Sequence, residues 1–237
     1  MARNPATAAT KRSASAPKRN VRWNGMSGLK GQRREVILRS VANVLRNSRL
    51  SSLTIQDVAD ELGMTKGNLY YYFKDKQDIL YQCHMRSMEI SLRALEEATA
   101  KGRTPSESLR ILLTGHIRGI LDDGFGGILQ TDLDNFRPDQ RKTYVKKRDE
   151  LERGARGMIE DGIRAGEFDP VNVKLTGFAI LGAINWIPKW YRPTGAFSPD
   201  TIVEEMVNYF LRGLQRQPGA SQKPPSKKKR QREQHEQ

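Results

Sequence analysis

The segment of residues 54–78, TIQDVADELGMTKGNLYYYFKDKQD, limits the possible fold more than any other part of the chain. It reads as two short helices joined by a glycine turn, with a third helix directly after them. Thr54 and Asp57 have the spacing of a capping box, and Gly63 stands where a helix end favours a left-handed residue. Thr65 then caps the second helix. This pattern is typical of a helix-turn-helix, whose second helix can lie in the DNA major groove.

The composition of the second helix favours DNA binding over an ordinary pair of packed helices. The helix contains no acidic residue, and it carries hydroxyl, amide and ammonium groups beside three consecutive tyrosines. A helix that merely faces solvent would normally include glutamate. We therefore expect this helix to meet DNA.

The segment resembles the DNA-binding domain of the tetracycline-repressor (TetR) family, which typically runs T-x-x-x-I-A-x-x-A-G-V-S-x-G-x-L-Y-x-H-F-x-x-K-x-x-L. The match extends over residues 31–80 and departs from the pattern at Leu62, Met64 and Tyr72. The first two are apolar replacements, and the third keeps a polar aromatic group. The matching residues are Thr54, Val58, Ala59, Gly63, Thr65, Gly67, Leu69, Tyr70, Phe73, Lys76 and Leu80.

This resemblance implies a transcriptional repressor that binds a palindromic DNA operator as a homodimer and is released by a small-molecule effector. Most of the implied DNA contacts should touch phosphates, whereas Lys66, Asn68 and Tyr71 are our candidates for reading base edges. The full set of predicted DNA-binding residues is Thr54, Thr65, Lys66, Gly67, Asn68, Tyr70, Tyr71, Tyr72 and Lys76.

The positive charge of the chain is concentrated at its two ends. The net charge is +14, of which residues 1–34 contribute +9 and residues 216–237 contribute +5, so that the part between them is neutral. Both ends are poor in apolar residues, and we expect disordered basic arms over residues 1–30 and 217–237. Such arms can simply aid solubility, but beside a helix-turn-helix they favour salt-dependent attraction to DNA phosphates.

The remaining sequence predicts an all-α fold of about nine helices, with the DNA-binding domain over residues 31–80 and a ligand-binding and dimerisation domain over residues 81–216. No strand pattern is present, and a break is expected at residues 122–127. The helix at 171–191 is apolar nearly all round and should be buried centrally. The last helix, from Ser198 and Pro199 onward, has more apolar residues than one small bundle must bury. This surplus predicts a homodimer through the last two helices. The other helices are expected at 33–46, 75–100, 104–121 and 138–165.

Catalytic, metal and membrane roles receive no support from the sequence. Its three histidines are scattered without metal-ligand spacing, and no nucleophile motif is present. Cys83 is the only cysteine, which excludes an internal disulfide and indicates packing in a reducing compartment. The longest apolar run, residues 177–188, is too short to cross a bilayer. We expect a cytoplasmic, nucleoid-associated protein that is not an enzyme and has no metal or cofactor.

A second informative segment is residues 183–195, AINWIPKWYRPTG. Trp186 and Trp190 lie one helical turn apart, with Pro188 between them and Lys189 and Arg192 close by. Aromatic surfaces beside cations suit a ligand with an apolar part and a phosphate or adenine part. The alternative is that both tryptophans belong to the core while the cations cap the helix end.

The pattern N-W-x-x-x-W-Y-x-P-x-G in this segment resembles TetR-family repressors of fatty-acid, phenylacetate and steroid degradation that bind acyl-coenzyme A thioesters. It implies the same effector class here, and His116 is expected to be a core or pocket-wall histidine. A multidrug-type repressor with a looser pocket for aromatic effectors, and a nonspecific nucleoid protein, remain open alternatives. The predicted ligand-binding residues are His116, Tyr144, Arg148, Phe178, Asn185, Trp186, Lys189, Trp190 and Arg192.

Overall fold

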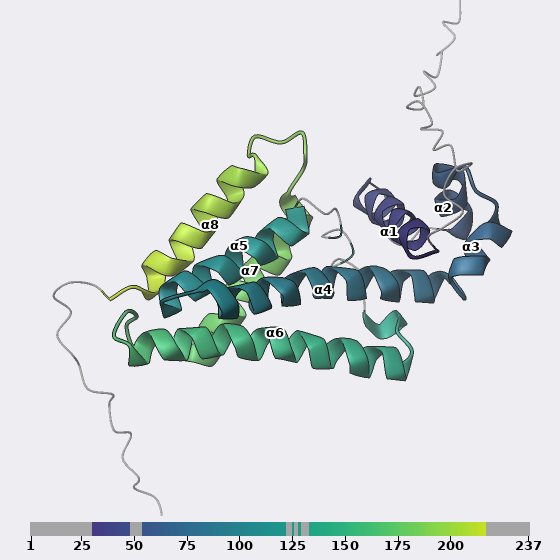
Figure 1. The fold of residues 1–237 in the computed structure, drawn as a ribbon. Coiled ribbons are helices and arrows are strands. Elements are labelled where there is room, and N and C mark those ends of the chain that lie inside the picture. Colours follow the sequence, from purple (N-terminus) through teal and green to yellow (C-terminus); the bar gives the residue numbers. More distant parts are fainter. Residues whose placement is uncertain (1–29, 48–53, 122–124, 126–127, 129–132, 217–237) are drawn as a thin grey trace, which may run out of the picture.

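The computed structural model describes residues 30–47, 54–121, 125, 128 and 133–216, and these ranges are helical almost throughout (Figure 1). The all-α prediction is confirmed, with eight α-helices and one short 3-10 helix in the described ranges. The predicted basic arms and most of the expected break at 122–127 lie outside those ranges. The helices are α1 (Lys30–Asn47), α2 (Ile55–Leu62), α3 (Lys66–Tyr72), α4 (Lys76–Lys101), α5 (Pro105–Leu121), η3 (Leu133–Asn135), α6 (Pro138–Arg164), α7 (Val173–Trp190) and α8 (Pro199–Leu214).

Side-chain caps set the limits of the first helices. The hydroxyl of Thr54 accepts the backbone N–H of Asp57, and the Asp57 carboxylate accepts the N–H of Thr54, so both halves of the predicted capping box are present. Gly63 ends α2 with a φ of 60°, a conformation that only glycine adopts at little cost. Asp75 caps α4 by accepting the N–H of Asp78. The chain between Thr54 and α4 is therefore held at each turn.

Helices α1, α2 and α3 share one core with the beginning of α4. The core contains Leu69 and Phe73 from α3 and its C-cap, together with the buried Cys83 of α4. Phe125 and Ile128, which come from the connection between α5 and α6, are fully buried in the same core. An ion pair between Glu35 of α1 and Arg86 of α4 (3.0 Å) adds a polar link. Tertiary packing thus joins the DNA-binding helices to the helical body.

The body of the molecule is built around α4, which lies between α5 and α6 (Figure 1). Helices α4 and α5 approach closely because α5 carries glycine at two contacts. A Cβ on Gly115 would lie 2.6 Å from the Cβ of Ala94, and one on Gly119 would lie 2.5 Å from the Ile90 side chain. Neither position has room for a larger residue without moving a helix.

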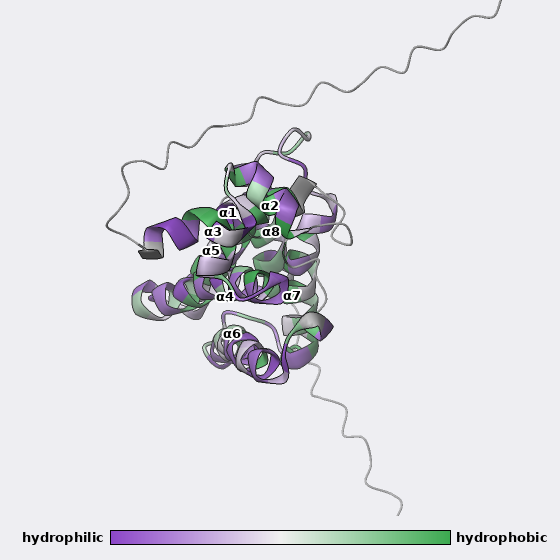
Figure 2. Ribbon diagram, turned by 90° about the vertical axis from the view of Figure 1, so that its right-hand side faces the viewer, coloured by the Kyte–Doolittle hydropathy of each residue, from purple (hydrophilic) through white to green (hydrophobic). Residues whose placement is uncertain are grey.

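Two expectations about the last helices need correction. Helix α7 was expected to be buried all round, but Leu175, Phe178, Trp186 and Trp190 are all exposed along one side of it. Most of the apolar surplus also lies on α7, because the apolar residues expected to be in excess on α8 are largely buried in the chain itself. Figure 2 shows hydrophobic and hydrophilic residues alternating around the helices of the body. An apolar pattern around a whole helix therefore does not show that the helix is buried on all sides within its own chain.

Candidate DNA-binding surface and effector pocket

Helix α3 has one side fixed in the core and the other turned to solvent. Leu69 is 1% exposed, whereas Tyr71 is 66% exposed. The helix begins where the Thr65 hydroxyl accepts the N–H of Asn68 (3.2 Å), and it ends at the buried Phe73. Such a short helix is held by its ends and its buried side, so its outward side chains have a defined position.

All nine residues predicted to contact DNA reach the surface around α3. Seven of them are exposed, and Tyr72 and Lys76 are partly exposed. Tyr71 and Tyr72 meet edge to face with ring centroids 5.1 Å apart, which orients both rings. The surface therefore presents hydroxyl, amide and ammonium groups together, a combination suited to phosphates and base edges.

One neighbouring residue was missed from the sequence. A groove beside α3 is bordered by Arg33 of α1 together with Gly63, Met64, Asn68, Tyr71 and Tyr72. Arg33 was counted with the basic N-terminal end and as the start of the helix expected at 33–46, but not as a DNA contact. The sequence did contain a signal for this, because Arg33 follows a basic segment at the start of the first helix. Basic residues gathered on one face are typical of a nucleic-acid-binding surface.

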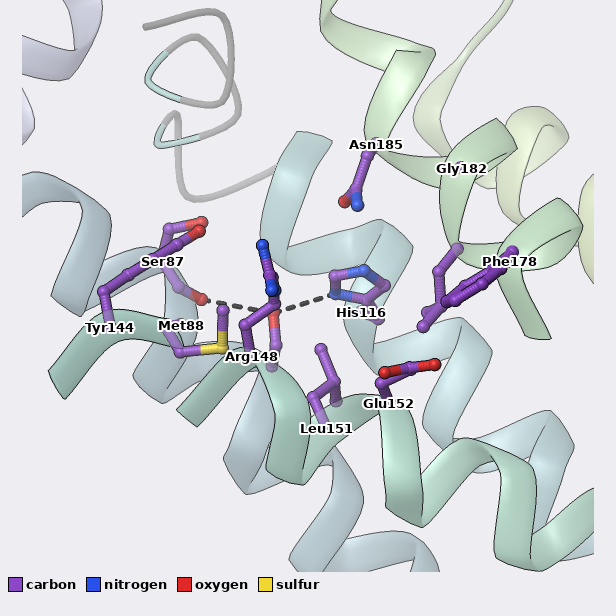
Figure 3. Close-up of a pocket in the computed structure, with 12 residues that line it drawn as sticks. Ser87, Met88, His116, Tyr144, Arg148, Leu151, Glu152, Phe178, Gly182 and Asn185 are labelled. Carbon is purple, nitrogen blue, oxygen red and sulfur yellow. Dashed lines mark hydrogen bonds between the residues drawn. The ribbon is translucent and has the colours of Figure 1, made fainter. Parts of the chain in front are cut away.

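A pocket of about 450 Å³ lies in the helical body between α4, α5, α6 and α7 (Figure 3). Five of the nine predicted ligand-binding residues line it, namely His116, Tyr144, Arg148, Phe178 and Asn185. The other lining residues come mainly from α4 and α6 and include polar groups among apolar ones. They are Ser87, Met88, Ser91, Leu151, Glu152, Leu181 and Gly182. Sequence reasoning missed these because the pocket is formed only when four helices pack.

His116 is one of the buried polar groups of the pocket wall. Its side chain is buried, and its Nδ1 lies 2.8 Å from the hydroxyl oxygen of Ser91. Burial lowers the pKa of His116 to about 4, and the neighbouring Asn185 side chain opposes this shift to a smaller extent. The imidazole is therefore neutral at pH 7.

Opposite charges share the α6 wall of the pocket. Glu152 lies 3.5 Å from Arg156 one turn further along α6, so a counter-charge is close at hand. Arg148 is about half exposed and forms an ion pair with the adjacent Asp149 (3.2 Å), which leaves most of its guanidinium accessible. The wall thus offers an accessible cation and a compensated anion.

His84 continues the pocket wall toward the DNA-binding end. It is buried, and its ring meets those of Phe136 (5.0 Å between centroids) and Tyr144 (5.3 Å) edge to face. Burial lowers the pKa of His84 to about 4. This histidine is a neutral member of an aromatic cluster. Within the described part of the chain, no group of three or more His, Cys, Asp or Glu side chains is suited to hold a metal ion.

The remaining four predicted ligand residues lie away from this pocket. Trp186 is 60% exposed and Trp190 is also exposed, which excludes the alternative that both belong to the core of the single chain. The Lys189 ammonium lies 5.9 Å from the Trp186 ring centroid. Arg192 donates to the backbone oxygen of Tyr191 (2.8 Å). These residues form an outer aromatic and cationic surface on α7 and the turn that follows it.

Comparison with known proteins decides the family. Residues 50–83 match the family described as bacterial regulatory proteins, tetR family, and residues 102–214 match the tetracyclin repressor-like C-terminal domain. The TetR family transcriptional regulator PfmR from Thermus thermophilus is 30% identical with a TM-score of 0.68, over 76% of this chain and 99% of that one. The chain belongs to the TetR family.

Two further TetR-family relatives inform its role. The HTH-type transcriptional repressor KstR2 of Rhodococcus jostii (strain RHA1) is 27% identical over 192 residues, which are 79% of this chain and 93% of that protein. The structure of AibR in complex with isovaleryl coenzyme A and operator DNA has the same fold (TM-score 0.65, 20% identity, 75% of this chain and 97% of that one).

This TetR-family member is therefore a transcriptional repressor with a DNA-binding domain. Its relatives are regulators and not enzymes, in agreement with the lack of a catalytic motif in the sequence. Among the helices of the described ranges, none combines the length and apolar character needed to span a lipid bilayer.

Proposed function

We propose that this TetR-family repressor binds a palindromic operator as a homodimer and is released from it by an acyl-coenzyme A thioester. The convergence of His116, Tyr144, Arg148, Phe178 and Asn185 on one pocket carries the proposal. These residues come from α5, α6 and α7, so no local sequence pattern could have brought them together. The proposal places the repressor on DNA in the cytoplasm.

The homodimer is supported by where large apolar side chains meet solvent. Apart from two tyrosines of α3, every exposed large hydrophobic residue of the described ranges lies on α7, α8 or the turn between them. A monomeric protein rarely leaves this many large apolar side chains uncovered on two consecutive helices. A two-fold pairing of this surface covers both copies at once. The residues are Leu175, Phe178, Trp186, Trp190, Phe197 and Tyr209.

The operator geometry follows from pairing two copies. Each subunit offers a single helix α3, and a two-fold axis relates the two helices. In helix-turn-helix dimers the half-sites lie about 34–36 Å apart on one face of the duplex. The proposal therefore predicts a palindromic site with one half-site for each α3.

The effector class is supported by the pocket and by the AibR complex. The pocket has the size and mixed lining of a small-molecule site. It can enclose an acyl group, while the charged nucleotide end of coenzyme A belongs in solvent near cations such as Arg148. The related AibR structure contains isovaleryl coenzyme A and operator DNA. Glu152 is the only acidic residue among the described residues that line the pocket, and Arg156 already compensates its charge. These lining residues therefore include no unpaired carboxylate to attract a cationic drug.

Release requires that the effector bind the DNA-free arrangement more tightly than the DNA-bound one. Arg137 provides a direct link for this coupling. It precedes α6, which carries Tyr144 and Arg148, and its guanidinium lies 3.1 Å from Asp75, the N-cap of α4. A movement of α6 on ligand binding therefore reaches Asp75, which lies two positions after Phe73 at the end of the DNA-reading helix.

The test begins with an operator selected from random-sequence duplexes by the purified protein. Fluorescence anisotropy then follows its release by acetyl-, isovaleryl-, hexanoyl- and palmitoyl-coenzyme A, with the free acids and coenzyme A alone as controls. We expect at least one thioester to release the DNA and its free acid to fail. Release by cationic dyes alone would assign the multidrug alternative, and failure to select any preferred sequence would assign nonspecific DNA coating. Sedimentation equilibrium tests the homodimer separately.

A further inference from the structure

The hydrogen bonds around His116 identify which of its ring nitrogens carries the proton. The Ser91 hydroxyl contacts two groups, the backbone oxygen of Ser87 (3.2 Å) and Nδ1 of His116 (2.8 Å). A carbonyl oxygen can only accept, so the single hydroxyl proton of Ser91 goes to Ser87, as is common for a serine inside a helix. The Ser91 oxygen then accepts, and Nδ1 must donate. Figure 3 shows the two bonds as dashed lines that meet between Ser87 and His116, and only one of them ends at the His116 ring.

The opposite assignment is unfavourable on both sides of the ring. If Ser91 donated to Nδ1, the carbonyl of Ser87 would face a hydroxyl oxygen at 3.2 Å without a proton between them. Nε2 would then carry a buried N–H that makes no hydrogen bond of ordinary length in the described ranges, although the Asn185 side chain is close enough to favour a protonated ring. With the proton on Nδ1, two hydrogen bonds of ordinary length form, Nδ1–H to Ser91 and Ser91 to Ser87, whereas the opposite assignment keeps only one, so the first arrangement is the stable one.

Nε2 of His116 is consequently a bare acceptor without a hydrogen bond of ordinary length in the described ranges, and the Asn185 side chain is its polar neighbour. The side chain is only 5% exposed, and Nε2 makes no hydrogen bond within the described ranges. The ring lines the pocket beside Asn185 of α7, as Figure 3 shows. Burial also keeps the ring neutral at pH 7, because its pKa is about 4. The pocket thus contains an enclosed lone pair that a bound molecule can satisfy.

We propose that the effector presents a hydrogen-bond donor, an O–H or an N–H, to Nε2 of His116. This inference rests on the proposed function only in naming a coenzyme A thioester as the carrier. A carbonyl or carboxylate oxygen at this position would face the lone pair without a proton and would be rejected. The donor has two sources in a thioester, a hydroxyl on the acyl group or an amide N–H of the pantetheine arm. With a hydroxyl, the repressor discriminates hydroxyacyl groups from their oxo and saturated counterparts.

The tautomer is tested without any effector. Long-range ¹H–¹⁵N spectra of the ¹⁵N-histidine-labelled protein report the protonation of each ring nitrogen, and the His116→Gln variant assigns the His116 signals by their loss. We expect a protonated Nδ1 and a bare Nε2 at pH 7. A protonated Nε2 would overturn the proposal, whichever effector the repressor binds.

The donor preference is tested with cyclohexanol and cyclohexanone, which differ only at the hydrogen-bonding group. The Nε2 signal of His116 is followed during titration of the wild-type protein with each compound. We expect cyclohexanol to shift this signal and to bind about five- to tenfold more tightly than the ketone, the ratio of one neutral hydrogen bond. Equal binding would overturn the proposal. This comparison contains no coenzyme A, so its outcome is independent of the thioester class.

The source of the donor is then determined by calorimetry with hexanoyl-coenzyme A and its 3-, 5- and 6-hydroxy and 3- and 5-oxo derivatives. Tighter binding of a hydroxy derivative assigns the donor to the acyl group. If the hydroxy derivatives bind like hexanoyl-coenzyme A, replacing the pantetheine amides by esters should weaken binding, which assigns the donor to the arm. If neither change alters affinity by more than twofold, no donor reaches His116 and the proposal fails.

Two serine variants separate the tautomer from general pocket effects. Ser91→Ala removes the acceptor of Nδ1–H, so the ring is free to adopt the other tautomer, and the alcohol-to-ketone preference should fall toward one. Ser87→Ala makes the same chemical change one turn earlier but keeps the backbone oxygen that fixes Ser91. It can weaken both compounds, but their ratio should persist. Loss of the ratio in Ser87→Ala and its survival in Ser91→Ala would contradict the assignment.

Discussion

Replacing Gly67 with alanine should change stability and DNA binding in opposite directions. Gly67 lies in the first turn of α3 with an ordinary helical backbone, since only Gly63 and Gly166 have a positive φ in the described ranges. A Cβ at position 67 would meet nothing closer than the Thr65 hydroxyl oxygen at 3.8 Å. The fold of the single chain therefore gives no reason for a glycine here.

The size of the stability gain follows from helix propensity. Alanine is favoured over glycine in a helix by about 0.5–1 kcal/mol, and no clash offsets this gain. For a chain of this length the midpoint of thermal unfolding should rise by about 1–4 °C. Gly157 of α6 is the matched control, because a Cβ there meets no atom within 4 Å and so has no clash either. Gly157→Ala should raise stability by a similar amount.

The loss of DNA affinity follows from the direction in which Gly67 faces. Two residues of an α-helix correspond to about 200° of rotation, so Gly67 points nearly opposite to the buried Leu69. A glycine on the outer side of the reading helix lets a DNA strand approach the backbone. We expect Gly67→Ala to weaken operator binding at least tenfold, about 1.4 kcal/mol, and Gly157→Ala to leave it unchanged.

Differential scanning fluorimetry and operator anisotropy measure the two effects on the same preparations. Weaker DNA binding by a protein of higher thermal stability excludes misfolding as the cause. If Gly67→Ala stabilised the repressor and bound the operator like the wild type, no DNA strand would approach that helix surface closely. The assignment of Gly67 as a DNA contact would then be wrong.

Three further predictions concern pH, coupling and assembly. The pKa values of His84 and His116 are lowered to about 4, below the ordinary 6.5, so the unfolded chain binds more protons between these values. The free energy of unfolding should be constant above about pH 7 and should be lower by about 2 kcal/mol per histidine at pH 5. Urea unfolding measures this, and a free energy that did not change with pH would refute the burial of the two histidines. Arg137→Gln should reduce the ratio of effector affinities for free and DNA-bound repressor by about fivefold, because it breaks the ion pair with Asp75. Arg141→Gln is the control and should leave the ratio unchanged, since its partner Asp134 lies in the adjacent η3. Trp186→Glu should shift sedimentation equilibrium toward the monomer, and an unchanged dimer would place the interface elsewhere.

The helix limits were predictable to within a few residues because local chemistry determines them. Thr54, Thr65 and Asp75 each bond to a backbone N–H three residues ahead, and Gly63 ends α2. Such signals are written in consecutive residues. The surroundings of Trp186 were not predictable in the same way, because an apolar side of a helix can be covered by its own chain or by a second copy. An apolar sequence pattern indicates that a helix side is covered, but not whether the same chain or a second copy covers it.

The pocket was only partly predictable for a related reason. His116 stood out as a histidine among apolar residues, but Ser87 and Ser91 are ordinary residues of a helical sequence. Their importance depends on α4 and α5 meeting at glycine contacts, which brings Ser91 to His116 across 25 positions. Likewise, Arg137 and Asp75 are 62 positions apart. Contacts of this kind come from tertiary packing, for which a single sequence contains no direct signal.

Release from DNA in the proposed mechanism requires only a small tilt of α4. Ser87 and Ser91 lie 12 and 16 residues beyond the Asp75 cap, or about 18–24 Å along the helix axis. A tilt of about 5° about the pocket moves the start of α4, and α3 with it, by roughly 2 Å, which is enough to break hydrogen bonds to DNA. The caps at Thr65 and Asp75 can stay intact throughout. Hydrogen exchange of the α3 amides should therefore be unchanged when the effector binds, whereas a loss of protection would show that release proceeds by local unfolding instead.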